Sequence, residues 1–367
     1  MKVRSIKLKN YRNYNGLDLD LSDNINIFIG RNAQGKTNIL EAIYYSSNGS
    51  SYRTNTETDL IMWNSPAAIA SLIFERMSVE SRLDFHFYRE KRRQIVHNGQ
   101  KINAKNLVGI INIVLFSPED LFLIKGAPAG RRKFLDTEIS QASPSYYGEL
   151  IKYNHILQQR NNLLKKIKEN KARKNMLELW DSQLAASAAK ITLKRLEAVK
   201  KLNMLANLMT RRISSNQENL TVSYTIKNME KMTDNIELWY NEMMAKSIDE
   251  DVWRGFTSIG PHRDDLGIFV NGIDLRAFGS QGQQRTGVLA LKLSELEFIR
   301  SETGEYPVLL LDDVMSELDS QRRQQLLDFI KRENIQTIIT ATDEAYFPDV
   351  RTGRYFRVEA GRAVPEI

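Results

Sequence analysis

The chain has 367 residues, 42% of them hydrophobic, which is enough for about two to three domains with buried cores. It has no cysteine and only four scattered histidines, which excludes disulfides and thiolate metal sites and argues against a transition-metal centre. The net charge of +7 favours a polyanionic partner, and the lack of a long apolar run leads us to expect a cytoplasmic protein without a membrane partner.

The start of the chain has the alternating pattern of antiparallel strands. We expect strands at 2–9 and 17–21, joined by a turn at 11–16, and further strands at 68–74, 82–88 and 94–97. Asn98 and Gly99 form the dipeptide most typical of a tight hairpin. An antiparallel flank is therefore predicted.

A phosphate-binding loop interrupts this flank. Residues 25–29 have the pattern of a buried strand, residues 38–45 that of a helix, and the loop between them matches GxxxxGK[ST]. Its glycines let successive N–H groups point at one anion, and the helix dipole adds to the attraction. A glycine-rich turn with an incidental lysine is the alternative, but strand, loop and helix all fall where phosphate binding needs them.

The chemistry of this loop predicts ATP and Mg²⁺ as ligands. Lys36 supplies a positive charge for the β- and γ-phosphates, and Thr37 supplies a hydroxyl ligand for Mg²⁺. We expect the nucleotide to lie against the whole loop, which consists of Gly30, Arg31, Asn32, Ala33, Gln34, Gly35, Lys36, Thr37 and Asn38.

Two short helices should follow the flank, at 118–124 and 131–139. Gly126, Pro128 and Gly130 punctuate the chain between them.

Two long helices are predicted next. Apolar residues recur at spacings of three and four through residues 146–167 and again through residues 184–209, with Arg160 and Arg195 as the exceptions. The charged segment 168–175 would be the turn of an antiparallel hairpin.

The basic charge of the chain is concentrated in this hairpin. Residues 145–212 hold 15 Lys and Arg against 5 Asp and Glu, a net charge of +10, so the rest of the chain sums to −3. Charge runs are usually solvated helix faces, but an excess of one sign also suits a surface that faces DNA.

A second anion-binding helix start is predicted at residues 279–286, GSQGQQRT. A helix with a buried apolar face is expected from 287 to 300. Ser280, Gly282 and Gln283 leave N–H groups and a hydroxyl at its positive end.

Residues 308–313, VLLLDD, read as a buried strand that ends in two acids. Ligands bind at the carboxyl ends of parallel strands, so we expect Asp312 to hold Mg²⁺ and Asp313 to orient or deprotonate the attacking water. Another buried strand at 336–340 ends near Thr342 and Asp343.

The phosphate loop and the acidic strand are far too distant in sequence for one βαβ unit, so one sheet must be assembled from both ends of the chain. We predict an α/β ATPase head with an antiparallel flank, formed by 1–143 and 250–367, and an inserted helical lever domain at 144–249.

At this point the sequence resembles the RecF family of recombination-mediator ATPases, which is related to ABC and SMC heads. The resemblance runs over the whole chain and rests on KLKNYRNY (7–14), the phosphate loop with TNILEAI, SYRT (51–54), GAPAGRRKFLD (126–136), GPHRDDL (260–266), SQGQQR (280–285) and LLLDDVMSELD (309–319).

The resemblance implies a weak, DNA-stimulated ATPase that acts as a switch. ATP would induce a homodimer in which Ser280 and Gly282 of one subunit cover the γ-phosphate bound to the other, and Arg12 would lie near the nucleotide. The family loads recombinase at gaps and at junctions of single- and double-stranded DNA, with RecR and RecO, in repair, replication restart and the SOS response.

Two departures from the wider ABC pattern bear on turnover. Asp313 stands where most ABC enzymes carry Glu, which implies slow hydrolysis. The usual switch histidine is absent after Thr340, and it stays open whether Thr342 or Asp343 replaces it.

Three rival functions fit less of the chain. A structural SMC-like DNA clamp would need longer helices and a hinge domain. An ATP-dependent nuclease of the overcoming-lysogenization-defect kind would need an acidic metal-binding domain for which no stretch remains. A small-molecule phosphotransferase would leave GSQGQQRT and SELD (316–319) unexplained.

Overall fold

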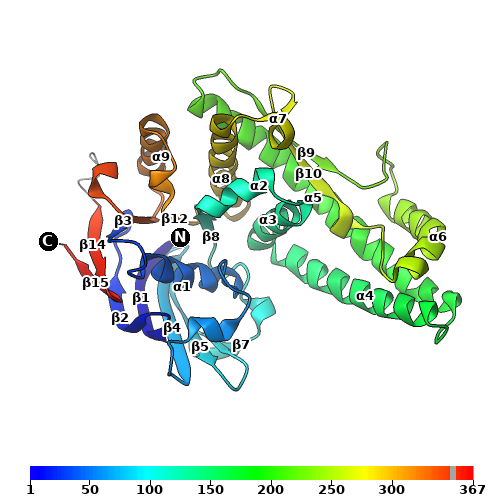
Figure 1. Ribbon diagram of the computed structural model, residues 1–367, viewed down its shortest axis with the longest axis horizontal. Coiled ribbons are helices and arrows are strands. Elements are labelled where there is room, and N and C mark those ends of the chain that lie inside the picture. The colour runs from blue at the N-terminus through cyan, green and yellow to red at the C-terminus, as the bar shows by residue number, and fades with distance from the viewer. Residues whose placement is uncertain (348–352, 367) are drawn as a thin grey trace. The chain divides into compact units, whose positions relative to one another are not determined.

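The computed structural model describes residues 1–347 and 353–366 (Figure 1). They form two compact units. The first contains Met1–Asp120 and Lys292–Ile367, and the second contains Leu121–Leu291. Within the described ranges, no helix is both long and apolar enough to cross a bilayer.

The first unit contains a six-stranded sheet built from both ends of the chain, in the order β15-β14-β3-β13-β12-β8. All its pairs are parallel except the last hairpin, β14–β15. Because β3, β13 and β12 run the same way, their carboxyl ends meet at one edge of the sheet. The strands are β3 (Ile25–Ile29), β8 (Ile113–Phe116), β12 (Val308–Asp312), β13 (Thr337–Ala341), β14 (Arg354–Glu359) and β15 (Arg362–Pro365).

The same unit contains the predicted antiparallel sheet, in the order β2-β1-β4-β5-β6-β7. Asn98 and Gly99 both have positive φ, at 49° and 82°, as a two-residue hairpin of the expected kind requires. The turn before β2 is shorter than predicted, because β1 and β2 already pair at Tyr11 and Tyr14. The strands are β1 (Lys2–Tyr11), β2 (Tyr14–Asp20), β4 (Ala67–Arg76), β5 (Val79–Tyr88), β6 (Gln94–His97) and β7 (Gln100–Ile102).

Helix α1 (Lys36–Asn48) shares one hydrophobic core with both sheets. Tyr45 packs edge-on against Phe85 and Phe87, with ring centroids 5.3 and 5.1 Å apart, while Ile39 and Ile43 are fully buried. Helix α9 (Ser320–Arg332) lies on the other side of the parallel sheet (Figure 1). Short 3-10 turns complete the unit: η1 (Glu57–Leu60), η2 (Ala104–Asn106), η3 (Pro118–Leu121), η6 (Val314–Ser316) and η7 (Glu344–Tyr346).

The second unit is built on the predicted helical hairpin. Helix α4 (Pro144–Lys168) packs against α5 (Glu178–Ile213), and α6 (Ile236–Arg254) packs against both. A three-stranded sheet has the order β11-β10-β9. The remaining elements are α2 (Phe122–Lys125), α3 (Pro128–Ala142), η4 (Lys174–Leu177), β9 (Leu220–Thr225), η5 (Pro261–Arg263), β10 (Asp265–Val270), β11 (Ile273–Asp274), α7 (Leu275–Phe278) and α8 (Gln281–Thr303), which continues into the first unit.

The two arginines that interrupt the apolar spacing of the hairpin are buried in its core. Arg160 is fully buried and donates to Asp181 at 2.5 Å and to Asp251 at 2.7 Å. Arg195 is 2% exposed and forms a bidentate pair with Asp136 of α3. Ion pairs with carboxylates from neighbouring helices therefore replace apolar packing at both positions.

Several element boundaries differ from expectation. Helix α3 begins at Pro128, because proline is pre-organised for the first helical turn, and so includes Gly130. Residues 118–124 form a 3-10 turn followed by α2. Helix α8 begins six residues earlier than predicted, at Gln281.

The compact units also differ from the domains expected from sequence. Strand β9, expected in the lever, pairs with β10, which was expected in the head. By packing, residues 121–143 and 250–291 therefore belong to the second unit. The division of the chain into a head and a lever at residues 143 and 250 stays a prediction about which parts act together in function.

Candidate nucleotide site

The phosphate loop joins β3 to α1 in a conformation that only glycine allows at two positions. Gly35 has φ +116°, and a Cβ there would lie 2.6 Å from Nδ2 of Asn13. A Cβ on Gly30 would lie 2.3 Å from the carbonyl oxygen of Val358. Asn13 also donates to the carbonyl of Gln34 at 2.9 Å, and Ala360 N–H donates to Oε1 of Gln34 at 2.7 Å. Neighbouring turns thus hold the loop from both sides.

Lys36 is the first residue of α1, and its ammonium group reaches back across the loop. Nζ donates to the carbonyls of Gly30 at 2.5 Å and Arg31 at 2.9 Å. Burial lowers the pKa of Lys36, while the nearby carboxylates of Asp313 and Asp312 favour its charged form. A cation is therefore held inside the loop, where an anion would be bound.

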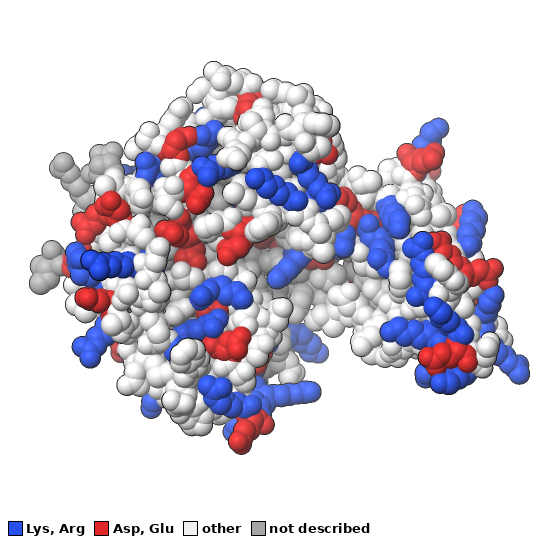
Figure 2. Space-filling model, in the orientation of Figure 1, with Lys and Arg blue, Asp and Glu red and all other residues white. Residues whose placement is uncertain are grey.

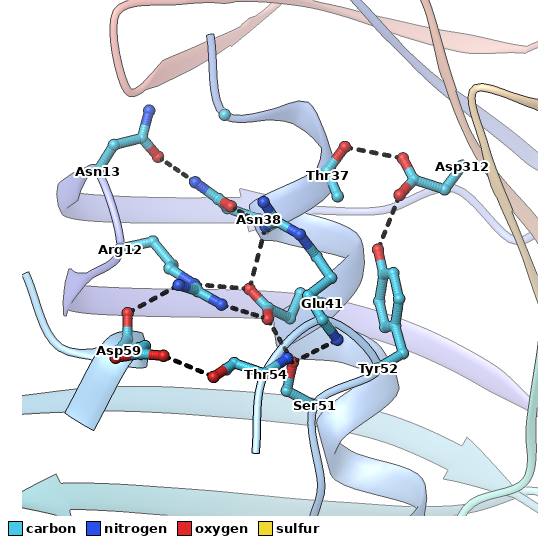
Figure 3. A network of polar contacts seen from close by, with 12 residues as sticks. Arg12, Asn13, Thr37, Asn38, Glu41, Ser51, Tyr52, Thr54, Asp59 and Asp312 are labelled. Atoms are coloured by element: carbon cyan, nitrogen blue, oxygen red, sulfur yellow. Dashed lines mark hydrogen bonds and ion pairs between the residues drawn. The ribbon is translucent and has the colours of Figure 1, made fainter. Parts of the chain in front are cut away.

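Asp312, at the end of β12, is bonded by three hydroxyl groups, and Figure 3 shows two of them, from Thr37 and Tyr52. Oδ1 accepts from Thr37 Oγ1 at 2.9 Å and from Thr340 Oγ1 at 2.8 Å. Oδ2 accepts from Tyr52 OH at 2.8 Å.

This oxygen pair suits Mg²⁺. A carboxylate and a hydroxyl are hard ligands that take part in Mg²⁺ binding together with nucleotide phosphates. Among the residues described, no cluster of three or more His, Asp or Glu could hold a metal ion alone. Thr37 and Asp312 therefore fit an ion that arrives with a phosphate ligand.

Asp313 follows directly and is held in an unusual backbone conformation. Its φ is 55°, and its N–H donates to Thr340 Oγ1 at 2.9 Å. Oδ1 is buried and accepts no hydrogen bond from any described residue. Burial raises the pKa of Asp313, although the ammonium of Lys36 opposes this shift. The carboxylate thus keeps an acceptor oxygen that no described residue uses, and its contact with an attacking water stays a prediction.

Arg12 is tied to α1 by a buried ion pair (Figure 3). It donates to both oxygens of Glu41, at 2.8 and 2.6 Å, and to the carbonyl of Asp59 at 2.9 Å. The Glu41 side chain is fully buried and also accepts from Ser51 Oγ at 2.5 Å. Arg53 donates to Asn38 Oδ1 at 2.6 Å, which connects this network to the end of the phosphate loop.

The predicted second helix start lies in the other unit. Ser280 Oγ accepts from Gln283 N–H at 3.2 Å, and Ser280 N–H donates to Oε1 of Gln283 at 3.1 Å. This reciprocal pair is a capping box, which explains why α8 begins at Gln281. Ser280 and Gly282 are exposed.

Comparison with known proteins shows the family of the chain. The profile of the RecF/RecN/SMC N-terminal domain family matches residues 2–361. The DNA replication and repair protein RecF of Halothermothrix orenii is 45% identical over 98% of this chain and 98% of its own length. RecF of Clostridium beijerinckii is 45% identical over 93% of this chain and 91% of its own. The chain belongs to the RecF family.

Solved structures agree with the family and with the expected α/β ATPase-head fold. The recombination mediator protein RecF, solved as RecF-ATP and described as part of the RecFOR pathway, has a TM-score of 0.92, with 35% identity, covering 100% of this chain and 98% of that one. The Smc head domain of Pyrococcus furiosus has a TM-score of 0.59 at 16% identity, covering 100% of this chain and 96% of that one, which shows a shared fold.

Within this RecF-family chain, the structure brings together the residues that sequence placed on the two distant motifs. Lys36, Thr37, Asp312 and Asp313 surround one end of the parallel sheet. Arg31, Asn32 and Ala33 form the exposed part of the loop, and Ala33 has φ 64°. Their contacts with a nucleotide, and those of Ser280, Gly282 and Gln283, stay predictions.

Tyr52, Glu41 and Thr340 complete the site and were not predicted to take part in it. Tyr52 belongs to SYRT, a motif that carried the family resemblance without a role. Thr340 is the last residue but one of the buried strand β13, beside β12, where it bonds both the Asp312 side chain and the Asp313 backbone. Thr342 and Asp343 are exposed, and Asp343 caps η7 by accepting from Ala345 N–H.

Proposed function

We propose that this RecF-family chain is an ATP-binding DNA-repair protein whose slow ATP hydrolysis acts as a switch. The observation that carries the proposal is the 2.9 Å bond between Thr37 Oγ1 and Asp312 Oδ1, which joins the phosphate loop to the acidic strand across 275 positions. Hydroxyl and carboxylate at this junction are the two protein ligands that a nucleotide-bound Mg²⁺ uses in phosphate-loop ATPases.

Each residue of the site has one role in this proposal. The backbone N–H groups from Gly30 to Asn38 bind the phosphates, and Lys36 neutralises the β- and γ-phosphates. Thr37 and Asp312 would hold Mg²⁺, which stabilises charge on the transferring phosphate. Asp313 orients the attacking water, and Arg12 lies near the nucleotide.

The proposed active form is an ATP-dependent homodimer. One phosphate loop with one lysine leaves the γ-phosphate of ATP partly uncovered, and a second helix start with Ser280, Gly282 and Gln283 can cover it. The resemblance to ABC and SMC heads supports a second helix start contributed by the opposite subunit. In functional terms, 1–143 and 250–367 form the head and 144–249 the lever.

DNA is the proposed partner of the dimer, in single-stranded, double-stranded and junction form, and RecO and RecR are the proposed protein partners. The RecF neighbour described as part of the RecFOR pathway supports this assignment. The concentration of positive charge in residues 145–212 supports a DNA-binding role for the lever.

Sedimentation of the chain with and without ATP and DNA tests the proposal. ATP with Mg²⁺ should convert monomer to dimer, and the dimer should co-sediment with DNA, because a ligand that binds the dimer more tightly than the monomer shifts the equilibrium towards the dimer. Lys36→Ala should stay monomeric in ATP, whereas Lys105→Ala, at an exposed lysine of the same unit, should dimerise normally. A wild-type chain that stays monomeric under saturating ATP would contradict the proposal.

A further inference from the structure

The C-terminal end of α6 exposes a large aromatic side chain. Trp253 is 73% exposed, and Phe256, three residues later, is 37% exposed. A tryptophan side chain is rarely so exposed, because leaving its large apolar ring in water costs more free energy than it does for most side chains. Gly255, with φ 75°, ends the helix between the two rings.

Basic side chains lie beside the segment that carries these rings. Lys168 Nζ of α4 donates to the carbonyl of Trp253 at 2.5 Å. A Cβ on Gly255 would lie 3.5 Å from Cγ of Lys165, so the stem of this lysine runs beside the turn. The guanidinium of Arg263 lies 4.8 Å from the Phe256 ring centroid. We call Lys165, Lys168, Trp253, Arg254, Phe256 and Arg263 the Trp253 patch.

The charge around the Trp253 patch is mainly positive. Residues 165–174 hold six Lys and Arg and one Glu. The three acids near the C-terminal end of α6 are paired: Glu250 with Arg254 at 2.7 Å, Asp249 with Lys174, and the buried Asp251 with Arg160. Figure 2 shows Lys and Arg predominating over Asp and Glu on this part of the unit.

We propose that the Trp253 patch binds single-stranded DNA, with one base stacked on Trp253 and the flanking phosphates on Lys165 and Lys168. This inference rests on the proposed DNA-binding function and gives it a site. Aromatic rings interleaved with basic side chains are the usual means by which proteins hold single strands without sequence preference.

Two physical reasons favour a single strand over other partners. Bases of a duplex are already stacked and paired, so an exposed tryptophan cannot reach their faces without disrupting the helix. Lysine is depleted at protein–protein interfaces, although arginine and tryptophan are enriched there. The lysines at positions 165, 166 and 168 therefore favour a phosphate backbone over a protein surface as the partner.

Binding of a fluorescently labelled oligo(dT) to the full-length chain tests the inference. Trp253→Ala should weaken binding about tenfold, the size expected for the loss of one stacked base. Trp253→Phe should keep most of the affinity, since a smaller ring still stacks. Leu238→Ala, at another exposed apolar residue of α6, is the matched control and should bind as wild type. Binding of a duplex of equal length should change less than twofold in all three variants.

Salt dependence tests the basic half of the Trp253 patch. Each phosphate neutralised on a single strand contributes about −0.7 to the slope of log K against log salt. Replacing Lys165 and Lys168 together by Gln should make the slope shallower by about 1.4 units, whereas replacing Lys190 and Lys200, both exposed on α5, should not. Equal flattening by the two pairs would overturn a localised site in favour of a diffuse basic surface.

The outcomes separate this inference from the broader proposal. If the wild type binds oligo(dT) and Trp253→Ala binds it equally well, the Trp253 patch is not the site, while DNA binding as such survives. That result would favour a protein as the partner that covers the Trp253 patch. If the wild type binds neither single-stranded nor duplex DNA, with or without ATP, both the inference and the proposed DNA-binding function fail.

Discussion

Tyr52 donates its phenolic hydroxyl to Oδ2 of Asp312 at 2.8 Å, although the two residues are 260 positions apart in the chain. Burial and the adjacent Asp312 carboxylate raise the pKa of Tyr52, so the phenol stays protonated and remains a donor. Thr37 and Thr340 already bond Oδ1 of Asp312. The bond from Tyr52 to Oδ2 therefore fixes the orientation of the whole carboxylate.

Tyr52→Phe should therefore weaken ATP binding in the presence of Mg²⁺ by about three- to tenfold, the equivalent of one hydrogen bond. Binding of ATP without Mg²⁺ should not change, because Tyr52 acts through Asp312. Tyr44→Phe is the control, since the Tyr44 ring packs edge-on against Tyr52 and its hydroxyl accepts from Nδ2 of Asn48 on the same helix. Calorimetric titration with and without Mg²⁺ measures both affinities, and an equal loss in the two titrations would exclude the proposed role.

Asp313→Asn should keep ATP affinity while turnover falls about 100-fold or more, as for loss of a general base. The ATP-bound dimer should then persist on DNA. Asp328→Asn, at an exposed acid on α9, should turn over normally. Single-turnover hydrolysis and dimer lifetime are the two measurements, and wild-type turnover in Asp313→Asn would remove this residue from the mechanism.

The raised pKa of Asp313 also predicts the sign of two pH effects. Turnover in the wild type should fall as pH drops through this raised pKa, because only the carboxylate can accept a proton from water. In the folded state the carboxylate is disfavoured relative to the unfolded chain, so it costs stability at neutral pH, and the cost disappears in acid. Asp313→Asn should consequently melt above wild type at pH 7 and show no such gain below about pH 4.

Arg12→Ala should destabilise the protein strongly, because it leaves the fully buried Glu41 without its bidentate partner. Breaking a buried ion pair from one side costs about 3–5 kcal/mol. The double variant with Glu41→Gln should recover part of this loss. Lys7→Ala, on β1 before the turn that carries Arg12, breaks an exposed pair with Asp18 and should cost less than about 1 kcal/mol. Urea unfolding measures all three, and a cost for Arg12→Ala no larger than for Lys7→Ala would contradict the role of this ion pair.

His262 should make the protein sensitive to acid. Burial lowers the pKa of His262 to about 4, and its Nε2 lies 3.1 Å from the carbonyl of Thr257, to which it donates, so Nδ1 accepts from Tyr153 OH at 2.5 Å. An unfolded histidine has a pKa of about 6.5. The unfolded state therefore binds more protons between these values, and stability that is complete above pH 6.5 is lost as pH falls towards 4, by about 3 kcal/mol.

His262→Gln should flatten this pH dependence, whereas His155→Gln, at an exposed histidine of α4, should leave it intact. Urea midpoints between pH 4.5 and 7.5 measure the effect. Parallel loss of stability in wild type and His262→Gln would show that other groups cause it.

Local pattern was enough to predict the parts of the site that are continuous in sequence. The strand, loop and helix around Lys36 follow one another directly, and Asp312 and Asp313 end an apolar run that is too short for a helix. The family resemblance singled out Arg12, but its buried partner Glu41 lies on the inward side of a helix and has no local signal. Tyr52 is coupled to Asp312 only by the tertiary fold.

In the helical hairpin, the sequence pattern predicted the helices but not the role of two buried residues. Its apolar spacing predicted α4 and α5 but marked Arg160 and Arg195 as interruptions, although both are buried and hold several elements of the second unit together. A charge in an apolar stripe has low cost only when carboxylates from other helices complete the pair, and those carboxylates are 21 to 91 positions away.

The shared nucleotide site of the proposed homodimer is tested most directly by mixing two inactive variants. Lys36→Ala should lose ATP binding, and Ser280→Arg should bind ATP as a monomer but fail to dimerise, since it places a bulky side chain at the capped start of α8. A mixed dimer regains one intact site only if the phosphate loop and the second helix start at Ser280 act across subunits. We predict that ATPase activity returns on mixing; no activity, in a heterodimer demonstrated by mass, would contradict the shared site.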